Sequence, residues 1–392
     1  ARCPGEARCP GEARHHADRR AVSAGVPAPV DAGPRDAPPL PHPVHVGAGL
    51  LARLPALVPA VAAAHRVVVI ADERADAHHG ATLRAALDPA RSLALTVPPG
   101  EAHKTRETWG ALTDAMLAAG VGRDAVVIAL GGGVAGDLAG FVAATYLRGV
   151  PVVQCPTTLL AMVDAAIGGK TGVDTPHGKN LVGAFHPPLA VVADVATLAT
   201  LPPRERAQGL AECLKHGVVA DAGYWARVRD ALPWPGDDAL RAIVEGSVAI
   251  KGGVVTRDPH EHGERAILNF GHTVAHALER VTRYALPHGE AVAIGMVVEA
   301  DVAHRLGLCD AAVRDALADA LPRAGLPVHV PRALDPHTVV VATAGDKKSR
   351  AGTVRYALPA ALGRIARADD GAWVHPVPDA VVHEALLAAR EA

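Results

Sequence analysis

The chain has 392 residues, of which 49% are hydrophobic and 20% charged, and its formal net charge is −2. This composition supports a large buried core over two or three domains, and the near-zero charge offers no basic field for nucleic acid. No stretch has the roughly 18 uninterrupted apolar residues that a membrane span needs. Five dispersed cysteines without metal-knuckle spacing favour free thiols in a reducing cytoplasm.

The N-terminal stretch differs in composition from the rest of the chain. Ala1-Arg-Cys-Pro-Gly-Glu6 is repeated at residues 7–12, and the residues that follow show no hydrophobic periodicity. The stretch lacks the apolar segment of a secretory signal. Because it offers too little apolar surface to offset the entropy of ordering, we expect residues 1–40 to be a disordered extension.

Alternating strand and helix patterns come next. Short apolar runs rich in valine, leucine and alanine predict strands at 66–71, 93–97, 124–130, 150–154 and 189–193, and helical spacing predicts helices at 81–87 and 107–119. Such alternation is typical of a Rossmann-like α/β domain, in which helices cover a parallel sheet. We place this domain at residues 41–200.

The pattern becomes mostly helical after Leu201-Pro-Pro203. Helices are predicted at 204–219, 240–252, 273–281 and 290–306, and one strand at 353–358. We therefore predict a second, mostly α-helical domain at residues 201–392. A cleft between two domains is a common place for a ligand, so we expect the site there.

A glycine-rich turn, Gly131-Gly-Gly-Val-Ala-Gly-Asp137, follows a predicted strand and opens a helix. Glycines let a phosphate group approach the backbone amides at the start of a helix. An ordinary strand-to-helix turn remains the alternative interpretation. Asp137 either bonds a sugar hydroxyl or caps its own helix. Thr157 and Thr158, after the next strand, either contact a cofactor or cap the following helix.

Lysine and asparagine are rare in this chain and cluster in polar motifs. Only seven of the 39 lysine and arginine residues are lysine, and only two residues are asparagine. Lys170, Lys179 and Asn180 lie in two glycine-containing segments, where flexible backbone would bring their donors to a bound anion. Lysine is a compact charge that arginine does not replace in a tight site. Chance placement is the alternative interpretation.

Histidines at helical spacing indicate a metal site. His272 and His276 lie four residues apart on one face of a predicted helix, and His288 follows twelve residues later. Together with a carboxylate, such ligands suit zinc. The chain contains 21 histidines, so a chance pair is an equally good interpretation of the spacing alone. Spacing does not distinguish Glu212, one helical turn before Lys215, from a surface carboxylate.

Four segments together resemble the 3-dehydroquinate synthase family. They are residues 131–188, 209–217, 268–279 and 288–296, which follow the family order within residues 42–390. The resemblance implies a dehydroquinate synthase-like fold and a phosphate-eliminating carbon–oxygen lyase of the shikimate pathway. The reaction would convert 3-deoxy-D-arabino-heptulosonate 7-phosphate to 3-dehydroquinate and phosphate, by transient oxidation with NAD, β-elimination, re-reduction and intramolecular aldol closure. The resemblance further implies bound NAD, one zinc or cobalt ion and a homodimer. The composition itself predicts a cytoplasmic location without nucleic-acid or membrane partners.

The resemblance also assigns roles to individual residues. Glu212, His272 and His288 would be the metal ligands, and His276 would take part in proton transfer. The other catalytic and substrate-contacting positions would be Arg148, Asp164, Lys170, Asn180, Lys215, Lys251, Glu261, Arg265, Asn269 and either Lys348 or its neighbour Lys347. Contacts with NAD would come from Glu101, Lys104, Gly132, Gly133, Val134, Ala135, Gly136, Asp137, Thr157, Thr158, Lys170, Lys179, Thr197, Leu198, Ala199 and Thr200. Arg148 would reach the phosphate of the substrate bound by the neighbouring subunit.

Three other interpretations stay open. Other sugar-phosphate cyclases, of the 2-deoxy-scyllo-inosose, valiolone or aminodehydroquinate synthase type, share the metal ligands and the NAD chemistry. The segments 258–269 and 286–295 favour 3-dehydroquinate synthase over them. Metal-dependent alcohol and glycerol dehydrogenases share the architecture but would show net turnover of NAD. The third interpretation is a non-catalytic regulator that binds NAD or a metal. The presence of every ligand expected for the enzyme argues against it.

Overall fold

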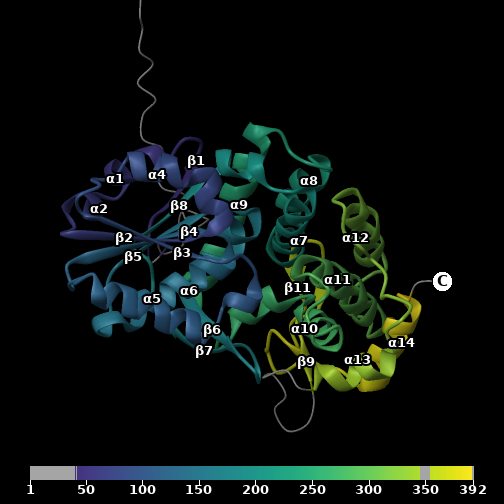
Figure 1. The fold of residues 1–392 in the computed structure, drawn as a ribbon. Helices are drawn as coiled ribbons and strands as arrows, with labels where there is room; N and C mark the ends of the chain where they lie inside the picture. The colour runs from purple at the N-terminus through teal and green to yellow at the C-terminus, as the bar shows by residue number, and fades with distance from the viewer. Residues whose placement is uncertain (1–39, 41, 345–353, 391–392) are drawn as a thin grey trace, which may run out of the picture.

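The computed structural model describes residues 40, 42–344 and 354–390 (Figure 1). Except for Leu40, the expected disordered extension at residues 1–40 lies outside the described residues. Lys347 and Lys348 also lie outside them. No described helix combines the length and the apolar character that a membrane crossing requires.

The N-terminal half is built on one parallel sheet. Its strands are β1 (Val44–Gly47), β2 (Arg66–Asp72), β3 (Ser92–Val97), β4 (Ala125–Gly131), β5 (Val152–Pro156) and β8 (Ala190–Asp194), in the order β1-β8-β5-β4-β2-β3. Every neighbouring pair is parallel, which confirms the predicted Rossmann-like sheet. β1 was not predicted, because a four-residue strand that contains His45 and Gly47 is too short to show a hydrophobic run.

Helices cover both faces of this sheet (Figure 1). One face packs against α1 (Leu54–Leu57), α2 (Pro59–Ala63) and α4 (Ala81–Ala85), and the other against α5 (Arg106–Ala118) and α6 (Gly133–Thr145). Side chains alternate along each strand, so Val67 and Val69 of β2 face the first layer while Val68 and Ile70 face the second. Because helices cover both faces, a ligand can reach the sheet at the carboxyl ends of its parallel strands.

A two-stranded hairpin extends from the sheet region, although the sequence did not predict it. Residues 168–170 and 178–180 were expected to be flexible backbone, but β6 (Lys170–Thr175) and β7 (Gly178–Phe185) pair in antiparallel fashion and pack on α6. Glycines hide the strand pattern here. A Cβ atom on Gly183 would lie 2.0 Å from the carbonyl oxygen of Thr171, so the pairing needs a residue without a side chain at this position.

The C-terminal half is mostly helical, as predicted. Its helices are α7 (Pro203–Ala220), α8 (Ala222–Asp230), α9 (Asp237–Arg257), α10 (His272–Val281), α11 (His288–Arg305), α12 (Ala312–Arg323), α13 (Pro336–Thr343) and α14 (Asp379–Ala388). Short strands β9 (Arg355–Tyr356), β10 (Pro359–Ala361), β11 (Arg364–Ile365) and β12 (His375–Pro376) lie among them. One hydrophobic core joins Val44 and Val46 of β1 to α7 and α9, so the domain division after residue 200 stays a prediction.

Two helices of this half cross at a pair of glycines. A Cβ atom on Gly295 of α11 would lie 2.0 Å from the carbonyl oxygen of Gly271, the residue that precedes α10. Beside them, the buried carboxylate of Glu299 accepts hydrogen bonds from the amides of Gly271 (2.7 Å) and Val274 (3.0 Å). The first turn of α10 is therefore fixed against α11.

This crossing generates a stability prediction. Gly295→Ala should destabilise the protein by about 1–3 kcal/mol, because the added methyl group meets rigid backbone. Gly110→Ala is the matched control, since a Cβ atom added at this position would meet nothing within 4 Å apart from its neighbours and the backbone of α5 itself, and it should stabilise the protein by about 0.5–1 kcal/mol. Urea denaturation measures both free energies of unfolding. Equal stabilities for the two variants would contradict the close crossing.

Candidate metal and substrate site

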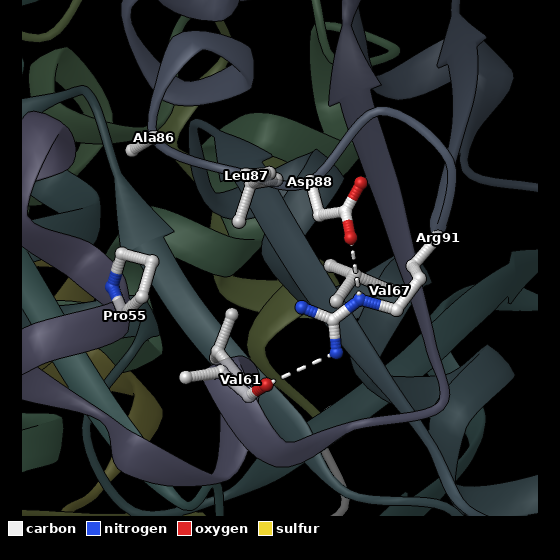
Figure 2. A pocket seen from close by; sticks show the side chains of 8 residues that line it. Pro55, Val61, Val67, Ala86, Leu87, Asp88 and Arg91 are labelled. Carbon is white, nitrogen blue, oxygen red and sulfur yellow. Dashed lines mark hydrogen bonds and ion pairs between the residues drawn. The ribbon is translucent and has the colours of Figure 1, made fainter.

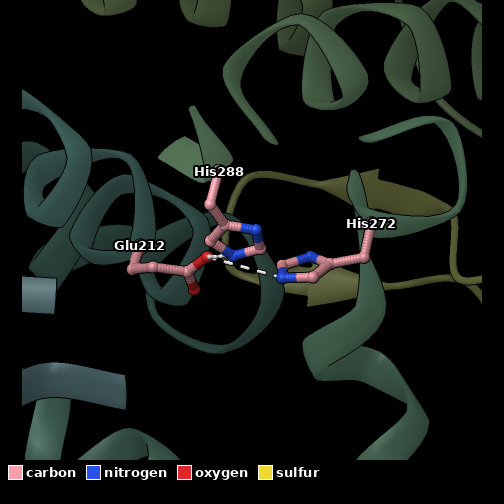
Figure 3. Close-up of side chains that lie close together, drawn as sticks. All are labelled: Glu212, His272 and His288. Atoms are coloured by element: carbon pink, nitrogen blue, oxygen red, sulfur yellow. Dashed lines mark ion pairs between the residues drawn. The ribbon is translucent and has the colours of Figure 1, made fainter. Parts of the chain in front are cut away.

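Three potential metal ligands meet where α7, α10 and α11 converge. Oε1 of Glu212 lies 3.5 Å from Nε2 of His272 and 3.7 Å from Nε2 of His288 (Figure 3). Their ligand atoms all lie within 4.8 Å of one another, and Glu212 is fully buried. Each side chain comes from a different helix, and both histidines stand at the first position of theirs.

The geometry of this group fits a divalent metal ion. Nitrogen and oxygen ligands about 2.1 Å from a tetrahedral zinc ion lie about 3.4 Å apart, close to the two separations that involve Glu212. The other ring nitrogen of each histidine faces an acceptor, as metal-bound histidines usually require. Nδ1 of His272 lies 3.1 Å from the carbonyl oxygen of Phe270, and Nδ1 of His288 lies 3.5 Å from Oε1 of Glu279.

The electrostatics of the group favour a cation. Burial alone would raise the pKa of Glu212, but the ammonium group of Lys215, one turn along α7, and the nearby histidines hold it well below its usual value. Burial alone would lower the pKa of His288, but the carboxylates of Glu212 and Glu279 raise it to about 10. The carboxylate of Glu212 is thus ionised and can bind a cation, and metal binding would displace the proton of His288.

His276 lies beside this group without joining it. Its ring is 5.6 Å from that of His272 and nearly perpendicular to it, and the three-residue ligand group does not include it. The predicted distinction between His276 and the metal ligands stays a prediction. Its position, one turn after a ligand, places an imidazole next to the chemistry.

Paired charges from both halves surround the ligand group. Nζ of Lys251, on α9, lies 2.5 Å from Oδ1 of Asp164 and 2.7 Å from the carbonyl oxygen of the same residue. One carboxylate oxygen of Asp164 lies within 4.8 Å of an oxygen of Glu212 and a ring nitrogen of His216. Burial alone would raise the pKa of Asp164, but Lys251 holds it below its usual value. Two predicted substrate contacts therefore adjoin the ligand group.

Glu261 links two further predicted site residues. Its carboxylate accepts hydrogen bonds from Nζ of Lys170 on β6 (2.5 Å) and from Nδ2 of Asn269 (2.8 Å). Glu261 has a φ of 59°, an uncommon conformation that often marks functional sites. Arg265 is buried nearby and donates to the carbonyl oxygen of Pro259 at 2.6 Å. A Cβ atom on Gly168 would lie 2.9 Å from its guanidinium group, so Arg265 also touches the start of the hairpin.

Lys104 ties the glycine-rich turn to the hairpin. Its buried ammonium group lies 2.5 Å from Oδ2 of Asp137 and 2.6 Å from Oδ1 of Asn180. Gly132 occupies the N-cap of α6, so the alternative in which Asp137 caps its own helix is wrong. Asn180 has a φ of 54°, another uncommon conformation. Asp137, a predicted cofactor contact, and Asn180, a predicted substrate contact, thus both bond to Lys104.

The predicted cofactor residues other than Lys170 and Lys179 lie where the strands of the parallel sheet end. The turn joins β4 directly to α6, as predicted, and a Cβ atom on Gly132 would lie 3.2 Å from the methyl group of Thr158. Oγ1 of Thr158 accepts a hydrogen bond from the amide of Ala161, so its capping role is confirmed. Thr197 and Thr200 lie in the turn after β8, where Thr200 also lies 3.1 Å from Nε2 of His79.

Three other predicted residues do not belong to the three-residue ligand group. Arg148 is exposed in the turn after α6, with a left-handed φ of 69°. Oε1 of Glu101 lies 3.8 Å from Nζ of Lys104, at the margin of an ion pair. Lys179 lies 3.4 Å from Oε1 of Glu279 and over the ring of Tyr284, 4.5 Å from its centre.

Glu279 was not among the predicted site residues, although its position carries one signal. The residue lies seven positions after His272, and helical periodicity puts positions i, i+4 and i+7 on one face. A carboxylate on the face that carries both histidines was therefore readable from the sequence. Its contact with His288 was not, because His288 begins a different helix.

A small hollow elsewhere does not belong to this site. It has a volume of about 90 Å³ and lies beside Pro55, Val61, Leu87 and Arg91 (Figure 2). These residues precede or adjoin the starts of β2 and β3, whereas the predicted cofactor residues follow the ends of the strands. The guanidinium group of Arg91 is already bonded to Asp88 and to backbone carbonyl groups. The hollow offers little for catalysis.

Comparison with known proteins identifies the family. The parallel sheet with its glycine-rich turn is typical of dinucleotide-binding domains. The helices joined to it carry a group of three potential metal ligands, so the chain has the arrangement of a metal- and nucleotide-dependent enzyme. Residues 94–208 match the sequence pattern of the 3-dehydroquinate synthase N-terminal region, and residues 209–349 match that of its C-terminal region. The chain is 46% identical over 331 residues to a 3-dehydroquinate synthase of Symbiobacterium thermophilum, covering 83% of this chain and 92% of the relative. The chain therefore belongs to the 3-dehydroquinate synthase family.

Solved structures of related cyclases share the fold. A 2-deoxy-scyllo-inosose synthase complexed with carbaglucose-6-phosphate, NAD⁺ and Co²⁺ is 26% identical, with a TM-score of 0.81, over 89% of this chain and 97% of that one. A 2-epi-5-epi-valiolone synthase from Streptomyces hygroscopicus with NAD⁺ and Zn²⁺ bound is 33% identical, with a TM-score of 0.77, over 90% and 97% of the two chains. These similarities confirm the predicted dehydroquinate synthase-like fold.

The ligand group generates a metal-binding prediction. Glu212→Ala should weaken Co²⁺ binding more than about 100-fold, because loss of a direct ligand should exceed the 10- to 100-fold effect of losing a supporting residue. His276→Ala should leave Co²⁺ affinity unchanged, because its ring lies outside the three-residue group. Titration of metal-free protein, followed by visible absorption, measures both affinities. Equal losses in the two variants would show that His276 is also a ligand.

Proposed function

We propose that this protein is a 3-dehydroquinate synthase, a phosphate-eliminating carbon–oxygen lyase acting on 3-deoxy-D-arabino-heptulosonate 7-phosphate. The observation that carries the proposal is the buried group of Glu212, His272 and His288, surrounded by ion-paired lysines that a phosphorylated sugar can engage. The 46% identity to a relative of that name favours this substrate over those of the related cyclases, which are 26% and 33% identical.

The chemistry requires two bound groups that the described residues fit. The metal ion, zinc or cobalt, would be held by the three ligands and would polarise a substrate hydroxyl as a Lewis acid. NAD would lie at the ends of the strands, against the glycine-rich turn, and would accept and return a hydride without net oxidation. The related cyclases with NAD⁺ and Co²⁺ or Zn²⁺ bound support both assignments.

The lysines and Arg265 would bind and orient the substrate. The two bonds from Lys251 to Asp164 use two of its three donors and leave one for a substrate oxygen. Lys170 is half exposed, so its ammonium group can turn from Glu261 to an incoming anion. Lys215, Lys251 and Arg265 are buried, and charges shielded from water act more strongly on a developing anion.

His276 would move a proton beside the metal ligands. It projects from the same face of α10 as His272, and an imidazole can accept and donate a proton near neutral pH. Asn269 and Glu261 would fix the position of substrate hydroxyls through the pair that they already form. The leaving phosphate can itself take up a proton, so the mechanism requires no strong protein base.

The protein would act as a cytoplasmic homodimer in the shikimate pathway, upstream of chorismate and the aromatic amino acids. The three described cysteines, Cys155, Cys213 and Cys309, are free thiols, which supports a reducing compartment.

An exposed surface supports the dimer. The outer strand of the hairpin exposes Leu181 and Phe185. Arg148 is exposed in a turn that ends at Val150, whose carbonyl oxygen lies 2.9 Å from Nε2 of His186, the residue after the hairpin. An exposed apolar strand near an exposed arginine supports a role for this surface in dimer formation.

The reaction generates a direct test. Purified protein with the heptulosonate phosphate, NAD and Co²⁺ should release phosphate continuously, while absorbance at 340 nm shows no net NADH. Chelation of the metal should stop phosphate release, and added Co²⁺ should restore it. Steady accumulation of NADH would instead identify a dehydrogenase. Phosphate release from other sugar phosphates but not from the heptulosonate phosphate would identify another cyclase.

The substrate-binding role of Lys170 generates a mutational prediction. Lys170→Met should lower kcat/KM about 10- to 100-fold, the loss expected for one charge-assisted hydrogen bond to the substrate. The fold should survive, because half of the Lys170 side chain is exposed. Arg241→Met is the matched control, since Arg241 pairs with Glu245 on the surface of α9, and it should leave kcat/KM unchanged. An unchanged kcat/KM in Lys170→Met would remove this lysine from the site.

A further inference from the structure

Glu279 makes a contact that the proposed reaction has not used. It lies on α10, is 4% exposed, and presents one carboxylate oxygen to two partners. Oε1 lies 3.5 Å from Nδ1 of His288 and 3.4 Å from Nζ of Lys179. A buried carboxylate needs such partners, because burial without them is costly. This one stands between a potential metal ligand and the hairpin.

The two ring nitrogens of His288 face different carboxylates. Nε2 lies 3.7 Å from Oε1 of Glu212, inside the ligand group, whereas Nδ1 faces Glu279. An imidazole bound to a metal through one nitrogen carries its proton on the other, and a carboxylate there fixes both the tautomer and the ring orientation. Glu279 occupies that place for His288. His272 has its equivalent acceptor in a backbone carbonyl group, that of Phe270.

The position of Glu279 is itself held from both sides. Lys179 comes from β7 and also lies over the ring of Tyr284, which follows α10. The amide of Tyr284 donates to the carbonyl oxygen of Glu279 at 2.6 Å, so the end of α10 folds back on this residue. The carboxylate is therefore placed by the hairpin and by its own helix rather than by solvent.

We propose that Glu279 is a positioning residue that orients His288 for metal binding through Nε2 and anchors that ligand to the hairpin through Lys179. The proposal rests on the metal centre of the proposed function. Glu279, on α10, would thus fix the ring orientation of His288, which lies on α11. Loss of the carboxylate should then weaken the metal centre without removing any ligand.

Cobalt binding to metal-free protein tests the proposal. Glu279→Gln should weaken Co²⁺ affinity about 10-fold and Glu279→Ala about 100-fold, the range found when an outer-shell partner of a metal-bound histidine is lost. Both should alter the visible absorption spectrum of bound Co²⁺, because the ring orientation of His288 changes. Glu290→Gln is the matched control. Glu290 lies in the first turn of α11 but bonds Arg204, so its substitution should leave affinity and spectrum unchanged.

The outcomes separate the inference from the function on which it rests. Thermal unfolding of the metal-free variants should match the parent protein, and the near-isosteric Gln variant keeps the test valid if the Ala variant does not fold. Parent-like affinity and spectrum in Glu279→Gln would overturn the positioning role and leave the metal centre standing. Failure of the parent protein itself to bind Co²⁺ would overturn the metal centre.

Discussion

The buried carboxylate of Glu212 is the constraint on which the rest of the structure depends. Removing an ionised carboxylate from water costs several kcal/mol unless close partners offset the loss. Lys215, one turn along the same helix, and the two histidines supply that compensation. The histidines reach Glu212 only because α10 and α11 converge on α7. Gly289 allows the approach of α11 to α7, since a Cβ atom there would lie 2.5 Å from the Cα atom of Gln208. Packing and electrostatics therefore select the same arrangement.

The described lysines show how the two halves of the chain are joined at the site. All five lie within ion-pair distance of a carboxylate, and three of these pairs connect the sheet and hairpin to the helical half. They are Lys170 with Glu261, Lys179 with Glu279, and Lys251 with Asp164. Most basic residues of this chain are arginine, whereas the ammonium groups of these lysines, which are compact charges, make close contacts at the site. The site is held together by the same groups that would engage the substrate.

Much of this could be read from the sequence, within physical limits. Periodicity predicted β2, β4, α7 and α10 because their apolar runs are long, but it missed β1, which is short, and the hairpin, whose glycines hide the alternation. Spacing identified His272 and His276 as one helical face. It also offered His288 as a third histidine. It could not separate His276 from the ligands or select Glu212, which the family resemblance did, because the ligands meet only through tertiary packing. The contacts of Glu279 and Glu299 join separate helices, so local patterns carry no trace of them.

The central claim is that one metal ion occupies the group formed by Glu212, His272 and His288. Anomalous diffraction from crystals grown with zinc, recorded on both sides of the zinc absorption edge, tests it most directly. We predict a single strong peak about 2.0–2.2 Å from Oε1 of Glu212 and from Nε2 of each histidine. A peak among Asp164, Glu212 and His216, the other potential ligand group of the described residues, would contradict the claim, as would no peak in this region.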